Sequence, residues 1–180
     1  MTMQEAVHYI HGARLYAKKV GLESMRSLLQ RVGNPHQRLA VVHVGGTNGK
    51  GSTCAMSESA LRAAGLHTGL YTSPYLERYN ERIRLRGAPI ADEAFLRAFH
   101  PVHAAVEALR LEGVHCTTFE IGTAAAFLAF EEARVDIAVI EVGVGGLNDP
   151  TNVILPVACA LCAIGLDHTA ILGDTEEAIA

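Results

Sequence analysis

A glycine-rich segment directly behind an apolar run most constrains what this chain can fold into. The segment is HVGGTNGKGST, residues 43–53, and it follows the apolar residues LAVV. Glycines let the backbone curl so that successive N–H groups point at one anion, and a helix that begins there adds the positive end of its dipole. A strand, a glycine turn, a lysine and a hydroxyl residue ahead of a helix together predict a phosphate-binding loop.

Two kinds of side chain in this loop can act on a phosphate. Lys50 supplies a mobile positive charge to the outer phosphates, and Ser52 or Thr53 offers a hydroxyl to Mg²⁺ or to a phosphate. The spacing fits the pattern G-x-x-x-x-G-K-[ST] loosely, because Gly51 stands where the Ser or Thr is expected. The alternative interpretation is a plain glycine turn between a strand and a helix.

Strand-like and helix-like patterns alternate along the rest of the chain. Apolar-rich runs predict strands over 38–44, 67–73, 135–143 and 157–165. Helical spacing predicts helices over 57–65, 92–109 and 119–133. The predicted fold is α/β, with a P-loop-containing, mostly parallel sheet and helices on both of its faces.

Smaller signals refine this prediction. The alternating segment 81–87 indicates a short edge strand or a hairpin. Pro101 is expected to kink or divide the helix that contains it. Thr117 and Glu120 have the spacing of a capping box at the start of the helix that follows. Asp174 or Thr175 can cap a further helix at the end of the chain.

Composition and charge exclude several classes of protein. The chain has 180 residues, 49% hydrophobic and 19% charged, with a net charge of −4, which indicates a folded globule without a general nucleic-acid or membrane surface. No apolar run is long enough to span a membrane or to form a signal peptide, so we expect a cytoplasmic protein. Cys159 and Cys162 lie within a predicted strand and are interpreted as core residues, with a redox or zinc role as the alternative.

Polar residues follow several of the predicted strands. Ser73, Glu141 and the pair Asp167–His168 each stand at or just after the carboxyl end of a strand. Ligands of open parallel sheets gather at that edge, so we expect these residues and Lys50 on one rim. A carboxylate there is costly unless it is paired or metal-bound, which makes Glu141 a candidate Mg²⁺ ligand; a solvated edge carboxylate is the alternative.

A basic run follows the second predicted strand. Its interpretation stays open between a charged face of an edge strand and a contribution to anion binding. It comprises Arg78, Arg82, Arg84 and Arg86.

Several motifs together resemble the folylpolyglutamate synthase/dihydrofolate synthase family of Mur-ligase-like, ATP-dependent amide ligases. They are GTNGKGS (46–52), YTSPYLERYNERI (71–83), TTFEIGTAAAF (117–127), VDIAVIEVGVGG with the following D-x-TNV (135–153), and IGLDHTAILGDTEEAIA (164–180). The resemblance implies an enzyme that uses MgATP to convert a folate or dihydropteroate carboxylate into an acyl phosphate. The amine of L-glutamate then attacks this intermediate.

The resemblance also implies roles for individual residues. Lys50, Glu141 and His168 would be catalytic, and Ser73, Glu141 and His168 would hold Mg²⁺. The ATP phosphates would be bound by Gly46, Thr47, Asn48, Gly49, Lys50, Gly51 and Ser52. The pterin or folate would lie near Gly21, Leu22, Glu23, Ser24, Thr118, Phe119 and Glu120. Departures from the family pattern occur at Ser24, Tyr75, Leu147, Asn148 and Pro150.

The family resemblance extends to domain organisation. Residues 1–180 are expected to be the N-terminal part of a Mur-ligase-like ATP-binding domain, and hence an incomplete ATPase domain. The C-terminal glutamate-ligase domain is expected to be absent from these residues, and this piece alone is expected to be inactive. Two alternatives are a P-loop NTPase or kinase and a degenerate nucleotide-binding module, neither of which forms an amide.

Overall fold

One mixed sheet organises the chain. The computed structural model describes residues 1–13 and 21–179, so residues 14–20 and Ala180 of the predicted domain lie outside the described residues. The sheet has the strand order β4-β3-β2-β5-β1-β6. Its strands are β1 (Val41–Gly45), β2 (Thr68–Tyr71), β3 (Ile83–Leu85), β4 (Ala88–Pro89), β5 (Ile137–Glu141) and β6 (Ala158–Leu161).

The four strands at the centre and at the β6 edge run parallel, and the other edge is antiparallel. β1 lies between β5 and β6, and β5 also pairs with β2. β3 pairs antiparallel with β2 and with β4, so segment 81–87 does enter an edge hairpin, as its alternating pattern predicts. The predicted mostly parallel α/β sheet is confirmed.

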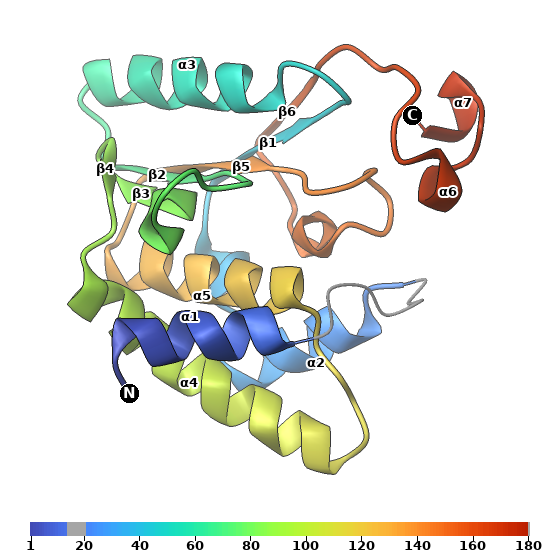
Figure 1. Ribbon diagram of the computed structural model, residues 1–180. Helices are drawn as coiled ribbons and strands as arrows, with labels where there is room; N and C mark the ends of the chain where they lie inside the picture. The colour runs from blue at the N-terminus through green and yellow to red at the C-terminus, as the bar shows by residue number, and fades with distance from the viewer. Residues whose placement is uncertain (14–20, 180) are drawn as a thin grey trace.

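Helices cover both faces of this sheet, as Figure 1 shows. α3 (Lys50–Ala63) lies on one face, where Cys54 packs with Val44, Leu70 and Val139. α5 (Thr118–Glu132) lies on the opposite face and is buried along most of its length. Beyond it pack α1 (Met3–Gly12), α2 (Glu23–Arg31) and α4 (Asp92–Leu111). Short helical segments complete the chain: η1 (Pro35–Arg38), η2 (Tyr79–Arg82), η3 (Pro150–Val153), α6 (Thr169–Leu172) and α7 (Glu176–Ile179).

Local signals at the helices have mixed outcomes. The Thr117–Glu120 capping box is present at the start of α5, and a helix does begin near the end of the chain at Glu176. Pro101 does not divide its helix, because α4 is one continuous element with the proline inside it, and the alternative that it kinks the helix stays a prediction. The helix predicted over 57–65 begins earlier, at Lys50, directly behind the glycine loop.

β6 corrects the prediction for residues 157–165. The apolar run predicts a buried strand, but β6 is an edge strand that pairs with β1, and Leu161 is 71% exposed. Cys159 is exposed, and Cys162 follows the strand and is half-buried. The interpretation of both cysteines as core residues is therefore wrong for Cys159, because its strand has a partner on only one side within the described part of the chain.

No helix among the described residues is long and apolar enough to cross a membrane. The cytoplasmic location stays a prediction.

Gly69 tests the packing between the sheet and α5. A Cβ at Gly69 would lie 2.7 Å from a ring carbon of the buried Phe130. We expect Gly69→Ala to lower the free energy of unfolding by about 1–3 kcal/mol through overpacking. Gly12→Ala is the control, since no described atom lies within 4 Å of its added Cβ. Chemical denaturation of both variants checks the prediction, and equal stability would contradict it.

Candidate active site

The glycine loop connects β1 to α3 by a tight curl. Gly46 and Gly49 both have positive φ, at +127° and +87°, which side chains other than glycine rarely adopt. A Cβ at Gly46 would also lie 2.8 Å from the Cβ of Cys162. Gly49 is the N-cap of α3, and the first helical bond joins Thr53 N–H to the Gly49 carbonyl. The N–H groups of Lys50, Gly51 and Ser52 therefore begin the helix without an intrahelical partner, which suits an anion.

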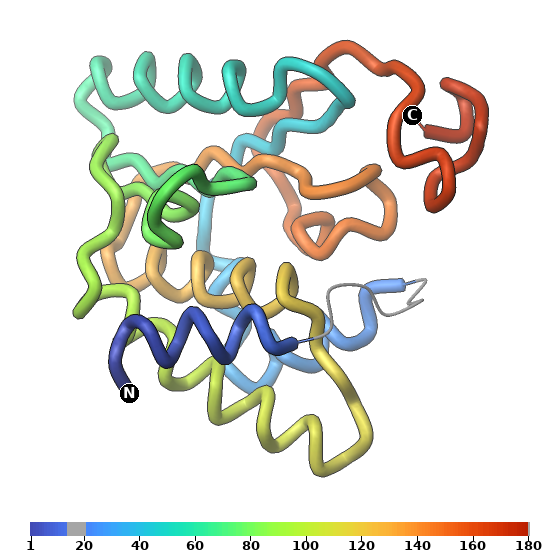
Figure 2. The backbone as a smooth tube through the Cα atoms, in the orientation of Figure 1, coloured from blue at the N-terminus to red at the C-terminus, as the bar shows by residue number. Residues whose placement is uncertain are grey.

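The outer part of the loop is fixed to the segment that follows β6. Thr47 and Asn48 donate their backbone N–H groups to the Ala163 carbonyl at 2.8 and 3.2 Å. Thr47 Oγ1 donates to the Gly165 carbonyl at 3.0 Å and accepts from Gly165 N–H at 3.1 Å. Figure 2 shows this red segment passing beside the tip of the loop. Two of the loop amides are thus already used inside the protein, so the amides left for the predicted phosphate contact are those at the start of α3.

Lys50 is half-buried and folded back over its own loop. Its Nζ donates to the carbonyls of Gly46 at 2.7 Å and Thr47 at 3.1 Å. An ammonium group has three donors, so one remains for a ligand. Ser52 is exposed, whereas Thr53 Oγ1 lies 3.3 Å from Cys162 Sγ and is turned away toward β6.

Glu141 and Ser73 meet beside the start of α3. Glu141 ends β5 and is buried, and its Oε2 accepts the Ser73 backbone N–H at 2.8 Å. Its other oxygen faces Gly51, where an added Cβ would lie 3.7 Å from Oε1. Burial raises the pKa of the Glu141 carboxyl, and the Ser73 bond and the charges of Lys50 and Arg82 oppose this shift. The structure thus brings together three of the predicted rim residues: Lys50, Ser73 and Glu141.

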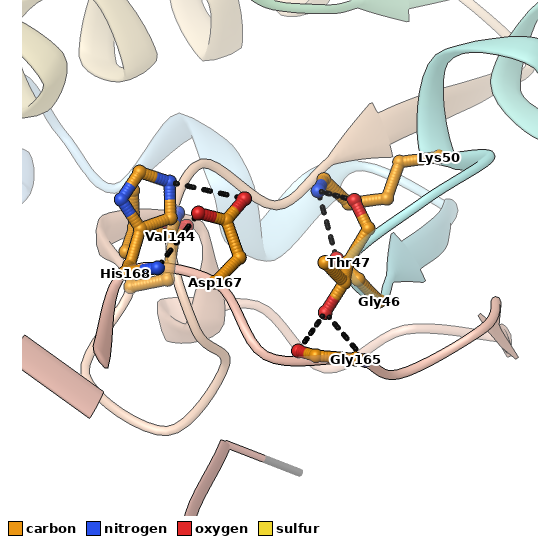
Figure 3. A network of polar contacts seen from close by, with 8 residues as sticks. Gly46, Thr47, Lys50, Val144, Gly165, Asp167 and His168 are labelled. Carbon is orange, nitrogen blue, oxygen red and sulfur yellow. Dashed lines mark hydrogen bonds and ion pairs between the residues drawn. The ribbon is translucent and has the colours of Figure 1, made fainter. Parts of the chain in front are cut away.

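Asp167 and His168 line a pocket beside the glycine loop. The pocket encloses about 200 Å³ and is also lined by Thr47, Lys50 and Val144. His168 has a left-handed backbone with φ 48°, its N–H is bound by Asp167 Oδ1 at 2.7 Å, and its ring is 3.9 Å from Asp167 Oδ2. Figure 3 shows the imidazole and this carboxylate facing Lys50 and Thr47 across the site.

Among the described residues, no three His, Cys, Asp or Glu side chains form a group that could hold a metal ion. Within the predicted ligand set, the Ser73 N–H contacts Glu141, but neither of these two residues lines the pocket that contains His168. The role of His168 as a metal ligand stays a prediction.

The predicted substrate segments 21–24 and 118–120 meet at the N-terminus of α5. Ser24 Oγ hydrogen-bonds Glu120 Oε1, and Glu120 Oε2 accepts the Thr117 N–H at 2.6 Å. Both oxygens of this buried carboxylate are thus used in the fold. Phe119 differs, because it lies against Gly143 and its ring is 5.9 Å from that of Tyr71. Gly21, Leu22 and Glu23 lead into α2, and Thr118 Oγ1 donates to the Ala13 carbonyl at 3.2 Å.

Asp149 is a site residue to which the sequence analysis assigned no role. This buried carboxylate accepts the N–H groups of Gly143 at 2.9 Å and Val144 at 3.0 Å, and so holds the glycine turn that lines the pocket. It also accepts from Thr151, whose hydroxyl lies 2.8 Å from Nε2 of the buried His43. Burial raises the pKa of Asp149, and these hydrogen bonds oppose the shift. The D-x-T spacing in 149–151 was the available signal.

The loop, the lysine and the acidic end of the neighbouring strand define a P-loop-type α/β unit. No family model matches the chain. The chain is 45% identical to the dihydrofolate synthase/folylpolyglutamate synthase of Bacillus subtilis over 179 residues, which are 98% of this chain and 42% of that protein. It is 44% identical to the folylpolyglutamate synthase of Lacticaseibacillus casei over 182 residues, covering 100% of this chain and 42% of that protein.

Solved structures agree with these relatives. An FPGS–AMPPCP–folate complex superimposes with a TM-score of 0.94 and 45% identity, over 99% of this chain and 44% of that one. E. coli FolC in complex with DHPP and ADP gives a TM-score of 0.90 and 34% identity, over 99% and 42%. The chain therefore corresponds to the N-terminal portion of the folylpolyglutamate synthase/dihydrofolate synthase family, which confirms the resemblance of its motifs. It spans about two fifths of the length of these relatives.

Lys50→Ala tests the glycine loop as a phosphate site. The substitution removes the only cationic side chain within segment 43–53. We expect the affinity for MgAMPPCP to fall by roughly tenfold or more, because a charge-assisted hydrogen bond is lost. Arg97→Ala, which removes one positive charge from the exposed surface of α4, is the matched control. Calorimetric titration measures both, and an unchanged affinity in Lys50→Ala would count against the phosphate site.

Glu141→Gln tests the buried carboxylate. A carboxyl pKa raised by folding makes the folded state bind a proton more tightly, so its ionisation destabilises the fold as pH rises through that pKa. The glutamine variant should therefore have the higher Tm at pH 7 in the absence of metal. It should lose this advantage as the pH falls below the ordinary range of glutamate. Melting curves at several pH values decide this, and a Tm difference that does not change with pH would refute the assignment.

Proposed function

We propose that the protein acts as the ATP-binding part of an ATP- and Mg²⁺-dependent ligase that adds L-glutamate to the carboxylate of a folate or a dihydropteroate. One observation carries this proposal. In a chain 45% identical to a dihydrofolate synthase/folylpolyglutamate synthase, the buried Glu141 faces Gly51 beside the Lys50 loop. This corner supplies main-chain amides, one ammonium and one carboxylate, the groups that MgATP requires.

The proposed reaction has two steps. A carboxylate oxygen of the acid attacks the terminal phosphorus of ATP, the bond to the bridging oxygen breaks, and ADP leaves. The amine of glutamate then attacks the acyl carbon, and phosphate leaves as the amide forms. The amides at the start of α3 and Lys50 hold the phosphates in line and offset the charge that develops on the leaving ADP.

Mg²⁺ fits the donors that the chain presents. Glu141 offers a hard carboxylate oxygen and Ser73 a hydroxyl beside it, while His168 would complete the set from the pocket beside Lys50. When bound, the ion neutralises phosphate charge. The burial of Glu141 supports this role, because an ionised carboxylate in that position gains from a cation.

The acid substrate would lie between Phe119 and the Gly143 turn. The partly exposed ring of Phe119 offers an apolar face, and segment 21–24 contacts the same end of α5 through the Ser24–Glu120 hydrogen bond. Two solved relatives are complexes with a nucleotide and either folate or DHPP, which supports this substrate class.

We also propose that residues 1–180 form the first part of a Mur-ligase-like ATP-binding domain and work within a longer chain. The relatives extend well beyond the matched portion, which supports this organisation. A C-terminal domain would then contribute to the glutamate site, and the described residues alone would not ligate.

The parent chain tests the proposed function by its products. We expect ADP release that requires both L-glutamate and a folate or dihydropteroate, with one new amide formed for each ADP. Phosphoryl transfer or ATP hydrolysis that does not depend on glutamate would instead show a P-loop kinase or NTPase. Binding of MgATP without turnover would show a degenerate nucleotide-binding module. Coupled ADP detection with mass spectrometry of the acid distinguishes the three.

A further inference from the structure

Arg82 differs from the other arginines of the basic run. It ends η2, directly before β3, and its guanidinium lies over the rings of Tyr75 and Tyr79, with Cζ 5.3 and 5.5 Å from the ring centroids. Tyr75 is itself held by His11, whose ring is parallel to it within 3° and whose Nε2 is 3.2 Å from the tyrosine hydroxyl. The guanidinium therefore has a defined position on two fixed aromatic faces.

No anionic partner neutralises this guanidinium within residues 1–13 and 21–179. Its Nε is shielded from solvent and has no hydrogen-bond acceptor, and no carboxylate lies within ion-pair distance. Its neighbours differ, since Arg78 pairs with Asp92 at 3.0 Å and Arg84 Nε donates to the Glu81 carbonyl at 3.4 Å. Stacking on tyrosines places a charge without cancelling it, so Arg82 keeps its full affinity for an anion.

The position of Arg82 links the two ends of the site. On one side its charge acts on the carboxyl of Glu141, whose Oε2 is bound by the Ser73 N–H. On the other side it acts on the hydroxyl of the buried Tyr71, whose ring is 5.9 Å from Phe119. The main chain agrees with this position, because the Arg82 carbonyl accepts the Thr72 N–H at 3.0 Å, next to Ser73, and Ile83 pairs with Tyr71 between β3 and β2. Arg82 thus lies beside both ends of the site.

We propose that Arg82 binds the carboxylate of the acid substrate, and that it also binds the acyl phosphate formed from this carboxylate. This inference rests on the proposed function. A guanidinium presents a planar fork of donors that matches both a carboxylate and a phosphoryl group. During the first step the carboxylate loses its charge to the leaving ADP, while the transferred phosphoryl group brings its own negative oxygens to the acid. The fork can pair with the carboxylate before the step and with the phosphoryl oxygens after it, and no proton has to move.

The aromatic support explains why this arginine, and not a more exposed one, suits the task. A carboxylate partner within the protein would compete with the substrate, whereas the two rings and the hydrogen bond to the Tyr71 hydroxyl fix the fork without cancelling its charge. Placing it near Glu141 also brings a second positive charge, besides Lys50, to the region where the acid and ATP meet. Arg82 is in these terms a substrate-binding residue at the reacting end of the acid.

Variants of the parent chain test the role of Arg82. Arg82→Gln removes the charge, Arg82→Lys keeps it without the fork, and Arg84→Gln removes a charge from the adjoining strand as the matched control. We expect kcat/KM for the folate substrate to fall by about tenfold or more in Arg82→Gln and by less in Arg82→Lys. MgAMPPCP affinity should stay within about twofold of wild type in all three, because nucleotide contacts are unchanged.

Two outcomes would overturn this role. One is a kcat/KM for folate in Arg82→Gln that stays within about twofold of wild type. The other is an equal loss of MgAMPPCP affinity in both Arg82 variants, which would make the residue a support of the fold or of the nucleotide. Calorimetric folate binding to the AMPPCP-loaded protein separates this test from the proposed function. Absence of glutamate-dependent turnover in the parent chain would contradict the proposed function. An unchanged folate affinity in Arg82→Gln would contradict only the proposed role of Arg82.

Discussion

The register between β1 and β5 is the constraint on which the site depends. Val44 pairs with Glu141, and the Val142 N–H donates to the Val44 carbonyl at 2.9 Å. This pairing sets the end of β5 level with the start of the glycine loop, with the Glu141 side chain on the face that α3 covers. A shift by one residue would turn the carboxylate to the opposite face, because side chains alternate along a strand. The hydrophobic residues Val139 and Val44 on the same face hold the register.

Burial and charge in the pocket follow from that arrangement. α3 packs directly on the sheet, so its first turn lies next to the ends of β1 and β5, where Lys50 is half-buried and Glu141 is buried. There the ammonium of Lys50 and the carboxylate of Glu141 interact more strongly than they would in water. Hydrogen bonds to the buried Asp149 fix the shape of the turn at 143–146, and hydrogen bonds to the Ala163 carbonyl fix part of the glycine loop. The site is thus assembled from backbone that is already fixed by hydrogen bonds.

Features fixed by local chemistry were predictable from the sequence, and those fixed by distant pairing were not. The glycine loop, the capping box at Thr117 and the α/β alternation each depend on neighbouring residues, and all three are present. The apolar composition of β6 predicts burial, yet its place at the edge leaves Cys159 exposed, and composition does not encode strand order. Arg82 was one of four arginines in a run, and only the tertiary placement of Tyr75 and Tyr79 distinguishes it.

The central claim is that the curled loop and the carboxylate beside it hold the phosphates and the cation of one nucleotide. Electron–nuclear double resonance on the protein with Mn²⁺ in place of Mg²⁺ and AMPPCP as the nucleotide tests this most directly. The account predicts coupling of the manganese electron spin to phosphorus, together with loss of that bound signal in the variants Lys50→Ala and Glu141→Ala. Bound Mn²⁺ without phosphorus coupling, or a signal indifferent to both substitutions, would contradict it.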